Sequence, residues 1–200
     1  MSSKDVQKFF DEKASAWEEN IPLISVTRAK EVINSLDLGG VKHILDVGCG
    51  TGILWEPLLQ NTRKDTRIFA IDISLRMLLF ARNRLSPRIT LLQADALHLP
   101  FPDGYFQWLF CYNTFPHFED PALVLSEFAR VMTPAGRVLI FHSKSKEEID
   151  AFHKAVGSTV KDHALPTKEC MANISKASGL EIQRLHEGHP GYLFLAEKTC

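Results

Sequence analysis

Ile44–Gly52 reads Ile-Leu-Asp-Val-Gly-Cys-Gly-Thr-Gly, an apolar run that ends in three glycines at alternate positions. The mostly apolar residues 53–59 follow at once and favour a helix. A strand, a tight glycine turn and a helix, in this order, hold a nucleotide-like ligand at the carboxyl end of a parallel strand. Glycine permits positive φ and lets a ligand approach the backbone, while the helix presents N–H groups and the positive end of its dipole. We therefore expect this stretch to organise an α/β fold around a bound ligand.

The spacing of the glycines separates two ligand classes. The dinucleotide-binding fingerprint is G-x-G-x-x-G. This chain instead has G-x-G-x-G, so its third glycine, Gly52, comes one residue too early. A dinucleotide-dependent oxidoreductase is therefore the weaker interpretation. A glycine turn that merely connects a buried strand to a helix is a further alternative, and the complete nine-residue string disfavours it.

The string Leu45–Gly52, with an acid at Asp46, resembles motif I of the class I S-adenosylmethionine (SAM)-dependent methyltransferases. The resemblance implies that Asp46 helps to hold the ammonium group of SAM, usually through water. It also implies that the glycine turn packs beside the methionine part of SAM. This assigns five turn residues to the cofactor site: Gly48, Cys49, Gly50, Thr51 and Gly52.

A second acid, Asp72, closes the apolar segment Arg67–Asp72 about twenty residues after the glycine turn. Nucleotide-binding α/β folds place a carboxylate there because it can accept hydrogen bonds from both ribose hydroxyls. The residues that follow, Ile73 and Met77, are expected beside the adenine. Simple core packing is the alternative for Met77.

Two later loops complete the expected cofactor site. Asp95 follows the apolar segment 89–93, and the resemblance implies that it accepts a hydrogen bond from the adenine amine while the N–H of Ala96 reaches a ring nitrogen. A turn residue that satisfies its own backbone is the alternative for Asp95. Asn113 follows the apolar segment 105–111, at the edge where doubly wound folds place their chemistry, so we expect it to border the methyl group.

Histidines are the candidate catalytic groups. The methyl group of SAM is already activated, so the protein mainly orients the acceptor and excludes water. A general base is needed only for an acceptor that carries a proton. His117 lies just after the methyl-bordering asparagine and His142 ends the apolar segment 137–142, so either could act as a neutral imidazole base. His153 and His163 are weaker candidates, and a capping, packed or surface role is the alternative for each histidine.

Periodicity and turn residues predict the remaining elements. Helices are expected over residues 1–20, 24–36, 52–60, 75–85, 121–132, 145–157 and 167–178. Strands are expected over residues 42–47, 67–72, 89–93, 105–111, 137–142, 180–186 and 192–198, with a turn over 133–136. The resemblance covers nearly the whole chain. It implies an α/β, Rossmann-like doubly wound sheet of seven strands, mostly parallel with an antiparallel last strand, in the order 3-2-1-4-5-7-6.

We expect one SAM-dependent methyltransferase domain over residues 1–200. It would comprise an N-terminal helical cap or lid (1–36), a SAM-binding core (41–142), and C-terminal helices with a β-hairpin (143–200). The segment Phe9–Trp17 resembles the N-terminal part of small-molecule methyltransferases, where it often folds over the cofactor as a lid. An amphipathic helix that docks on the core is the alternative.

The composition suits one globular domain, with 200 residues, 45% of them hydrophobic, and a net charge of −1. The basic residues are scattered, which disfavours a nucleic-acid partner, and no apolar run approaches the ~20 residues of a membrane span. The four cysteines form no C-x-x-C pair, so we expect reduced packing thiols and no metal site. Together with a polar N-terminus, these features predict a cytoplasmic protein. We expect a monomer or a homodimer, and the sequence does not decide between them.

Together these features predict transfer of a methyl group from SAM to a small-molecule acceptor, with release of S-adenosylhomocysteine. Little sequence lies outside the expected core, which disfavours a docking surface for protein or nucleic acid. The motif of DNA adenine methylases is also absent, because Asn113 is followed by Thr114 rather than by two prolines. Two alternatives stay open: a SAM-fold enzyme that uses the cofactor for another reaction, and a non-catalytic SAM-binding or regulatory protein.

Overall fold

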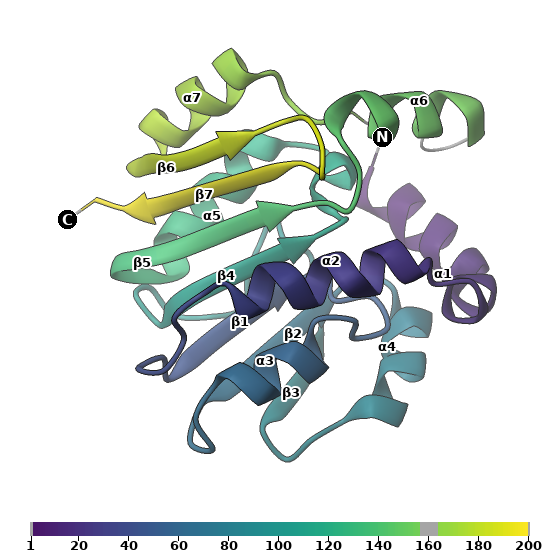
Figure 1. Cartoon of the computed structure of the whole chain (residues 1–200), viewed down its shortest axis with the longest axis horizontal. Helices are drawn as coiled ribbons and strands as arrows, with labels where there is room; N and C mark the ends of the chain where they lie inside the picture. Colours follow the sequence, from purple (N-terminus) through teal and green to yellow (C-terminus); the bar gives the residue numbers. More distant parts are fainter. Residues whose placement is uncertain (1, 157–163, 200) are drawn as a thin grey trace.

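A seven-stranded sheet in the order β3-β2-β1-β4-β5-β7-β6 runs through the protein (Figure 1). The structure is a computed structural model and describes residues 2–156 and 164–199. The strands are β1 (His43–Val47), β2 (Arg67–Asp72), β3 (Ile89–Gln93), β4 (Phe106–Tyr112), β5 (Met132–Phe141), β6 (Leu180–His186) and β7 (Leu193–Lys198). The predicted strand order is confirmed.

Parallel pairing joins the first five strands, and β7 reverses the direction. β1 pairs in parallel with both β2 and β4, while β7 is antiparallel to β5 and β6. The chain leaves β1 toward β2 on one side and later returns to β4 on the other. A crevice forms at such a reversal of strand order, outside the carboxyl ends of the strands. The fold therefore places a binding site beyond Val47, Asp72 and Tyr112.

Helices cover both faces of the sheet. They are α1 (Ser3–Glu19), α2 (Leu23–Asn34), α3 (Trp55–Asn61), α4 (Leu75–Ala81), α5 (Pro121–Val131), α6 (Lys146–Val156) and α7 (Lys168–Ala177), with short 3-10 helices η1 (Arg82–Arg84) and η2 (Phe115–His117). In Figure 1, α2 and α3 cross in front of the sheet and α5 lies behind it. None of the described helices is both long and apolar enough to cross a membrane.

The alternation of side chains along the strands divides the core into two layers. On β1, Leu45 and Val47 pack in the layer that contains Phe128 of α5 and Met171 of α7. Ile44 points to the other layer, with side chains of α2, α3 and α4. Both faces of β1 are buried, as expected for a parallel strand covered by helices on each side. The strand end at Val47 is consequently held rigidly from both layers.

Two predicted helix boundaries were wrong. The helix expected from residue 52 begins at Trp55, because Gly52 has φ of +88° and belongs to a turn. The helix expected over 75–85 ends at Ala81 and tightens into η1. The predicted helix after residue 120 agrees well, since Asp120 caps it and Pro121 occupies its first position.

The predicted turn over residues 133–136 lies inside β5 as an irregularity. Phe106 pairs with Met132 and Trp108 pairs with Arg137, so two steps along β4 face five steps along β5. Four residues of β5 (133–136) therefore lie opposite the single residue Gln107 of β4, and Ala135 among them has φ of +58°. The turn-forming residues make a bulge within β5, and the strand continues on both sides of it.

Candidate active site

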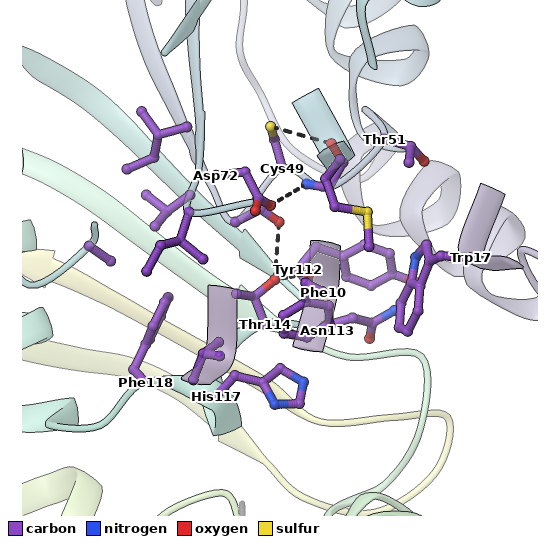
Figure 2. A pocket seen from close by; sticks show the side chains of 18 of the residues that line it. Phe10, Trp17, Cys49, Thr51, Asp72, Tyr112, Asn113, Thr114, His117 and Phe118 are labelled. Atoms are coloured by element: carbon purple, nitrogen blue, oxygen red, sulfur yellow. Dashed lines mark hydrogen bonds between the residues drawn. The ribbon is translucent and has the colours of Figure 1, made fainter. Parts of the chain in front are cut away.

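A cavity lies beyond the carboxyl ends of β1, β2 and β4, beneath α1 (Figure 2). From the predicted cofactor residues its lining includes Gly48, Cys49, Gly50, Thr51, Asp72, Ile73, Met77, Asp95, Ala96 and Asn113. His117 also lines it. Three predicted site residues are not part of the lining: Asp46, Gly52 and His142. The structure thus brings most of the predicted site together from four separate segments of the chain, which follow β1, β2, β3 and β4.

The glycine turn is folded tightly against the neighbouring strand ends. The N–H groups of Gly48 and Cys49 both donate to the Ile71 carbonyl, at 2.9 Å each. Gly48 has φ of +69°, and a Cβ atom there would come within 2.2 Å of the Thr114 methyl group. The Thr114 hydroxyl in turn donates to the Gly48 carbonyl at 3.0 Å. Both its conformation and its close contacts require glycine at position 48.

Asp72 joins the loops that follow β1 and β2. Its Oδ2 accepts a hydrogen bond of 2.8 Å from the Gly50 N–H, and its Oδ1 accepts one of 2.8 Å from the Ser74 N–H. Burial raises the pKa of Asp72 to about 6, although these two N–H donors act in the opposite direction. A carboxylate has about four acceptor positions, so Asp72 can still accept from a ligand hydroxyl.

Asp46 supports the turn from beneath. Its side chain is only 1% exposed, and its Oδ2 accepts a hydrogen bond of 3.0 Å from Nε1 of Trp55 on α3. Burial raises the pKa of Asp46 to about 7; the Trp55 bond lowers it and the nearby Asp72 charge raises it. The resemblance implies that Asp46 helps to hold the ammonium group of SAM, usually through water, and in the structure its side chain does not itself line the cavity.

Trp55 supports the glycine turn from outside the cavity lining, a role that sequence reasoning missed. A Cβ atom on Gly52 would lie 2.6 Å from the Trp55 ring, so the third glycine of the motif makes room for this indole. A buried tryptophan normally needs a partner for its N–H, and Asp46 supplies it. The signal in the sequence was a large aromatic residue three positions after the last glycine of the turn.

The predicted adenine-binding residues line one side of the cavity. Ile73 and Met77 flank Ser74, whose hydroxyl accepts the Met77 N–H at 3.1 Å and caps α4. Asp95 Oδ1 accepts the Leu97 N–H at 3.0 Å. Asp95 therefore makes the local turn that was its alternative role, and it also lies on the cavity wall.

Asn113 and His117 follow β4 and face the cavity from the opposite side. Asn113 has φ of +54°, and its Oδ1 accepts a 3.0 Å hydrogen bond from the Ser143 N–H. His117 ends η2 and is 9% exposed. Its ring meets Phe10 of α1 edge to face, with 5.0 Å between the centroids. The loop after β4 is thus held against both the loop after β5 and the N-terminal helix.

His142 has a different environment from His117. Its backbone N–H donates to the Tyr192 carbonyl at 2.9 Å, and its ring lies edge to face with Tyr192, 5.9 Å between centroids. The end of β5 thus turns this histidine toward β7, although its position in the sequence predicted the site edge. The His153 side chain and all of His163 lie outside the described residues.

The N-terminal helices are fastened over the cavity at two places. On α1, the Asp11 carboxylate accepts hydrogen bonds from the Ser74 hydroxyl (2.6 Å) and the Arg76 N–H (3.1 Å). On α2, the Ser25 carbonyl accepts a hydrogen bond of 2.7 Å from the Tyr112 hydroxyl at the end of β4. Figure 2 shows Phe10 and Trp17 of α1 beside Asn113 and His117. Sequence reasoning expected a cap but identified none of these contacts.

The buried thiols are packing groups in this arrangement. Burial raises the pKa of the Cys49 thiol and of the Cys111 thiol, so both stay neutral at pH 7. Within residues 2–156 and 164–199, no group of three His, Cys, Asp or Glu side chains is placed to hold a metal ion. The chemistry available from the described lining is that of one imidazole, an amide, hydroxyls and carboxylates.

Comparison with known proteins points to one enzyme family. Residues 45–140 match the family model of the methyltransferase domain. Methyltransferase GfsG of Streptomyces halstedii is 30% identical over 158 residues, which cover 76% of this chain and 52% of the relative. Demethylmenaquinone methyltransferase of Thermus thermophilus is 36% identical over 102 residues, which cover 50% of this chain and 46% of the relative. The chain spans about half the length of these curated relatives.

A solved structure has the same architecture. A SAM-dependent methyltransferase from Aquifex aeolicus superposes with a TM-score of 0.72 at 19% identity, covering 94% of this chain and 96% of that chain. At this level of identity the comparison establishes the fold, and the sequence relatives carry the family assignment.

Proposed function

Since the chain belongs to the class I SAM-dependent methyltransferases, we propose that it transfers a methyl group from SAM to a small-molecule acceptor and releases S-adenosylhomocysteine. One observation carries the proposal. The glycine turn, the acid at the end of β2, the loop after β3 and the loop after β4 all line one cavity at the point where the strand order reverses. No observation favours a SAM-fold protein that does not transfer methyl groups.

The lining residues fit SAM in their chemistry. Gly50 has φ of +53°, and a Cβ atom there would meet no other atom within 4 Å, so the turn leaves open space beside its backbone. Asp72 is a buried carboxylate with acceptor capacity left for vicinal hydroxyls. Ile73 and Met77 offer an apolar surface to a flat ring, and Asp95 offers an acceptor for an amine.

We assign the parts of SAM accordingly. The turn Gly48–Gly52 would border the methionine part, Asp72 would hold the ribose, and Asp95 with Ala96 would hold the adenine edge. Asp46 would act on the methionine part indirectly, because it lies behind the turn and binds Trp55. When bound, SAM supplies an electrophilic methyl group on a sulfonium.

The chain's own residues would then orient the acceptor and exclude water. Phe10 and Trp17 of α1 cover the cavity beside Asn113 and His117, which would keep bulk water from the reacting groups. His117 is the proposed base for an acceptor that loses a proton, because its imidazole lines the cavity beside the loop after β4. His142 receives no such role, since its ring lies against Tyr192.

Further features stay proposals. We propose a cytoplasmic location, which the free thiols Cys49, Cys111 and Cys170 support. A monomer or homodimer without nucleic-acid partners remains the expected assembly. The division into a cap (1–36), a SAM-binding core (41–142) and a C-terminal part (143–200) also remains a proposal, supported by the separate attachment of α1 and α2 over the cavity.

The proposal is tested in two steps. Calorimetry with SAM, S-adenosylhomocysteine and NAD in turn should show micromolar binding of the first two and none of NAD. Mass spectrometry of reactions with a library of small acceptors should then detect S-adenosylhomocysteine together with a product heavier by one methylene. NAD binding without SAM binding would overturn the assignment.

A further inference from the structure

The charged side chains that line the cavity share one sign. Among the lining residues that the structure describes, Asp72, Asp95 and Glu119 are acidic, and none is a lysine or an arginine. A site built for a phosphate or carboxylate substituent normally supplies Arg or Lys, because a desolvated anion needs a counter-charge. The part of the lining that the structure describes therefore supplies no Arg or Lys to recognise an anionic acceptor.

Two of the three acids are already engaged within the protein. Asp72 accepts the N–H groups of Gly50 and Ser74, and Asp95 accepts the N–H of Leu97. Both are also the acids proposed to hold SAM. Glu119 remains, and it is exposed at the end of the loop after β4. Water and salt screen an exposed charge, so Glu119 attracts a bound cation only weakly.

The wall on the α1 side is mainly aromatic or aliphatic, and Ser3 and Ser25 are its polar members. Phe10 lies between Trp17 and His117, with centroid distances of 6.0 Å and 5.0 Å (Figure 2). Ile21 and Pro22 continue this wall, and Phe118 faces the cavity from the loop after β4. The next residue along the chain, Leu23, is a large apolar side chain that is 78% exposed.

From this distribution we infer that the acceptor is an uncharged molecule with an aromatic or aliphatic body, bound between the α1 wall and the loop after β4. The inference rests on the proposed function and narrows its substrate class. A phosphate or carboxylate would lose its hydration without gaining a cationic partner from the described lining. A second cation would meet the sulfonium of SAM with only the exposed Glu119 to offset it.

Binding of matched probes tests the inference without needing the true acceptor. The purified protein is first titrated with S-adenosylhomocysteine, and the saturated protein is then titrated by calorimetry with 1-naphthol, 1-naphthoate and 1-naphthylmethylammonium at pH 7.5. These probes share one ring system and differ in charge. We expect 1-naphthol to bind about tenfold or more tightly than either charged probe.

A charge-reversal variant sharpens the test. Glu119→Lys places a cation at the mouth, so the affinity for 1-naphthoate should rise several-fold while that for 1-naphthol changes little. Glu181→Lys is the matched control, because Glu181 is an exposed glutamate of β6 that does not line the cavity. It should leave the ranking of the three probes as in the wild type.

The outcomes separate the inference from the proposed function. Absence of S-adenosylhomocysteine binding would defeat the proposed function itself. Binding of S-adenosylhomocysteine together with 1-naphthoate or 1-naphthylmethylammonium as tight as that of 1-naphthol would overturn the inference alone. The inference also fails if none of the three probes binds the saturated protein, because the apolar wall would then not be an acceptor site.

Discussion

The Asp11 carboxylate on α1 accepts a hydrogen bond of 2.6 Å from the Ser74 hydroxyl at the start of α4. Ser74 caps α4 by accepting the Met77 N–H, and its own N–H donates to Asp72. One chain of hydrogen bonds thus links the N-terminal helix to the acid proposed to hold the ribose. The position of α1 is therefore coupled to the loop after β2.

Asp11→Ala should loosen α1 and weaken SAM binding a few-fold, since one such hydrogen bond contributes about 1 kcal/mol. Hydrogen exchange of residues 3–19 should accelerate in the variant, while exchange in β1 stays as in the wild type. Glu12→Ala is the matched control, because Glu12 is the exposed neighbour on the same helix. Unchanged exchange of α1 in Asp11→Ala would show that the contact does not fasten the helix.

Asp46→Asn should stabilise the protein by about 2–4 kcal/mol at pH 8 and by a smaller amount, about 1–2 kcal/mol, at pH 5. The pKa of Asp46 is raised to about 7, so the folded protein holds this proton more tightly than the unfolded chain. The free energy of unfolding of the wild type therefore falls as the pH rises from about 4 to about 7. The amide of Asn avoids this loss, and its carbonyl oxygen can still accept the Trp55 N–H. Urea unfolding at both pH values measures the difference.

Asp46→Ala provides the contrast, because it also removes the acceptor of the Trp55 N–H. This variant should be less stable than the wild type at pH 5. At this pH the Asp46 side chain of the folded wild type is mostly protonated, so its removal relieves little buried charge and mainly loses the hydrogen bond from Trp55. If Asp46→Asn and wild type differed equally at pH 5 and pH 8, the buried charge would not be the cause.

Gly48→Ala should destabilise the fold more than Gly50→Ala. Both glycines have positive φ, so both variants incur a backbone penalty of about 1 kcal/mol. Only Gly48 would also drive its new Cβ into the Thr114 side chain, at 2.2 Å. Chemical denaturation of the two variants isolates this steric contribution, and equal losses would contradict it.

Asp72→Asn should weaken SAM binding by about tenfold or more. A carboxylate has two acceptor oxygens, which the N–H groups of Gly50 and Ser74 share with the ribose, whereas an amide has only one. The pKa of Asp72 is raised to about 6. Wild-type affinity for SAM should therefore fall as the pH drops below about 6, where the carboxylate becomes protonated. Calorimetry from pH 5 to pH 8 measures both effects, and an affinity that is flat in the wild type would remove Asp72 from the ribose.

Local sequence patterns predicted the strands, and the resemblance to a known family supplied the strand order and the part of the cavity lining that follows β1, β2, β3 and β4. The segment around Gly48 and the acid at Asp72 each follow a strand directly, and parallel strands bring such ends to one edge. Periodicity likewise separates strands from helices. In a strand successive side chains alternate between the two faces of the sheet, whereas in a helix side chains of one face recur every third or fourth position.

Contacts between distant segments could not be predicted in this way. Asp11 reaches Ser74 over 63 positions, and Tyr112 reaches Ser25 over 87. Such pairs depend on how α1 and α2 dock, which no short motif specifies. His142 shows the same limit, since the end of a strand predicts proximity to the site while side-chain direction depends on the pairing with β7.

His117→Gln should lower turnover by about 10²-fold or more for an acceptor that loses a proton, while the affinity for S-adenosylhomocysteine stays within about twofold. The imidazole lines the cavity beside the loop after β4 and packs against Phe10, so it can take a proton from the acceptor without touching the residues proposed to hold SAM. Glutamine keeps a polar side chain of similar reach and cannot act as a base.

His98→Gln is the control, because His98 is exposed and does not line the cavity. The decisive readout is the pH–rate profile, whose acidic limb should vanish in His117→Gln and persist in His98→Gln. Full turnover of His117→Gln with a proton-bearing acceptor would assign His117 to packing against α1 and leave proton removal to solvent.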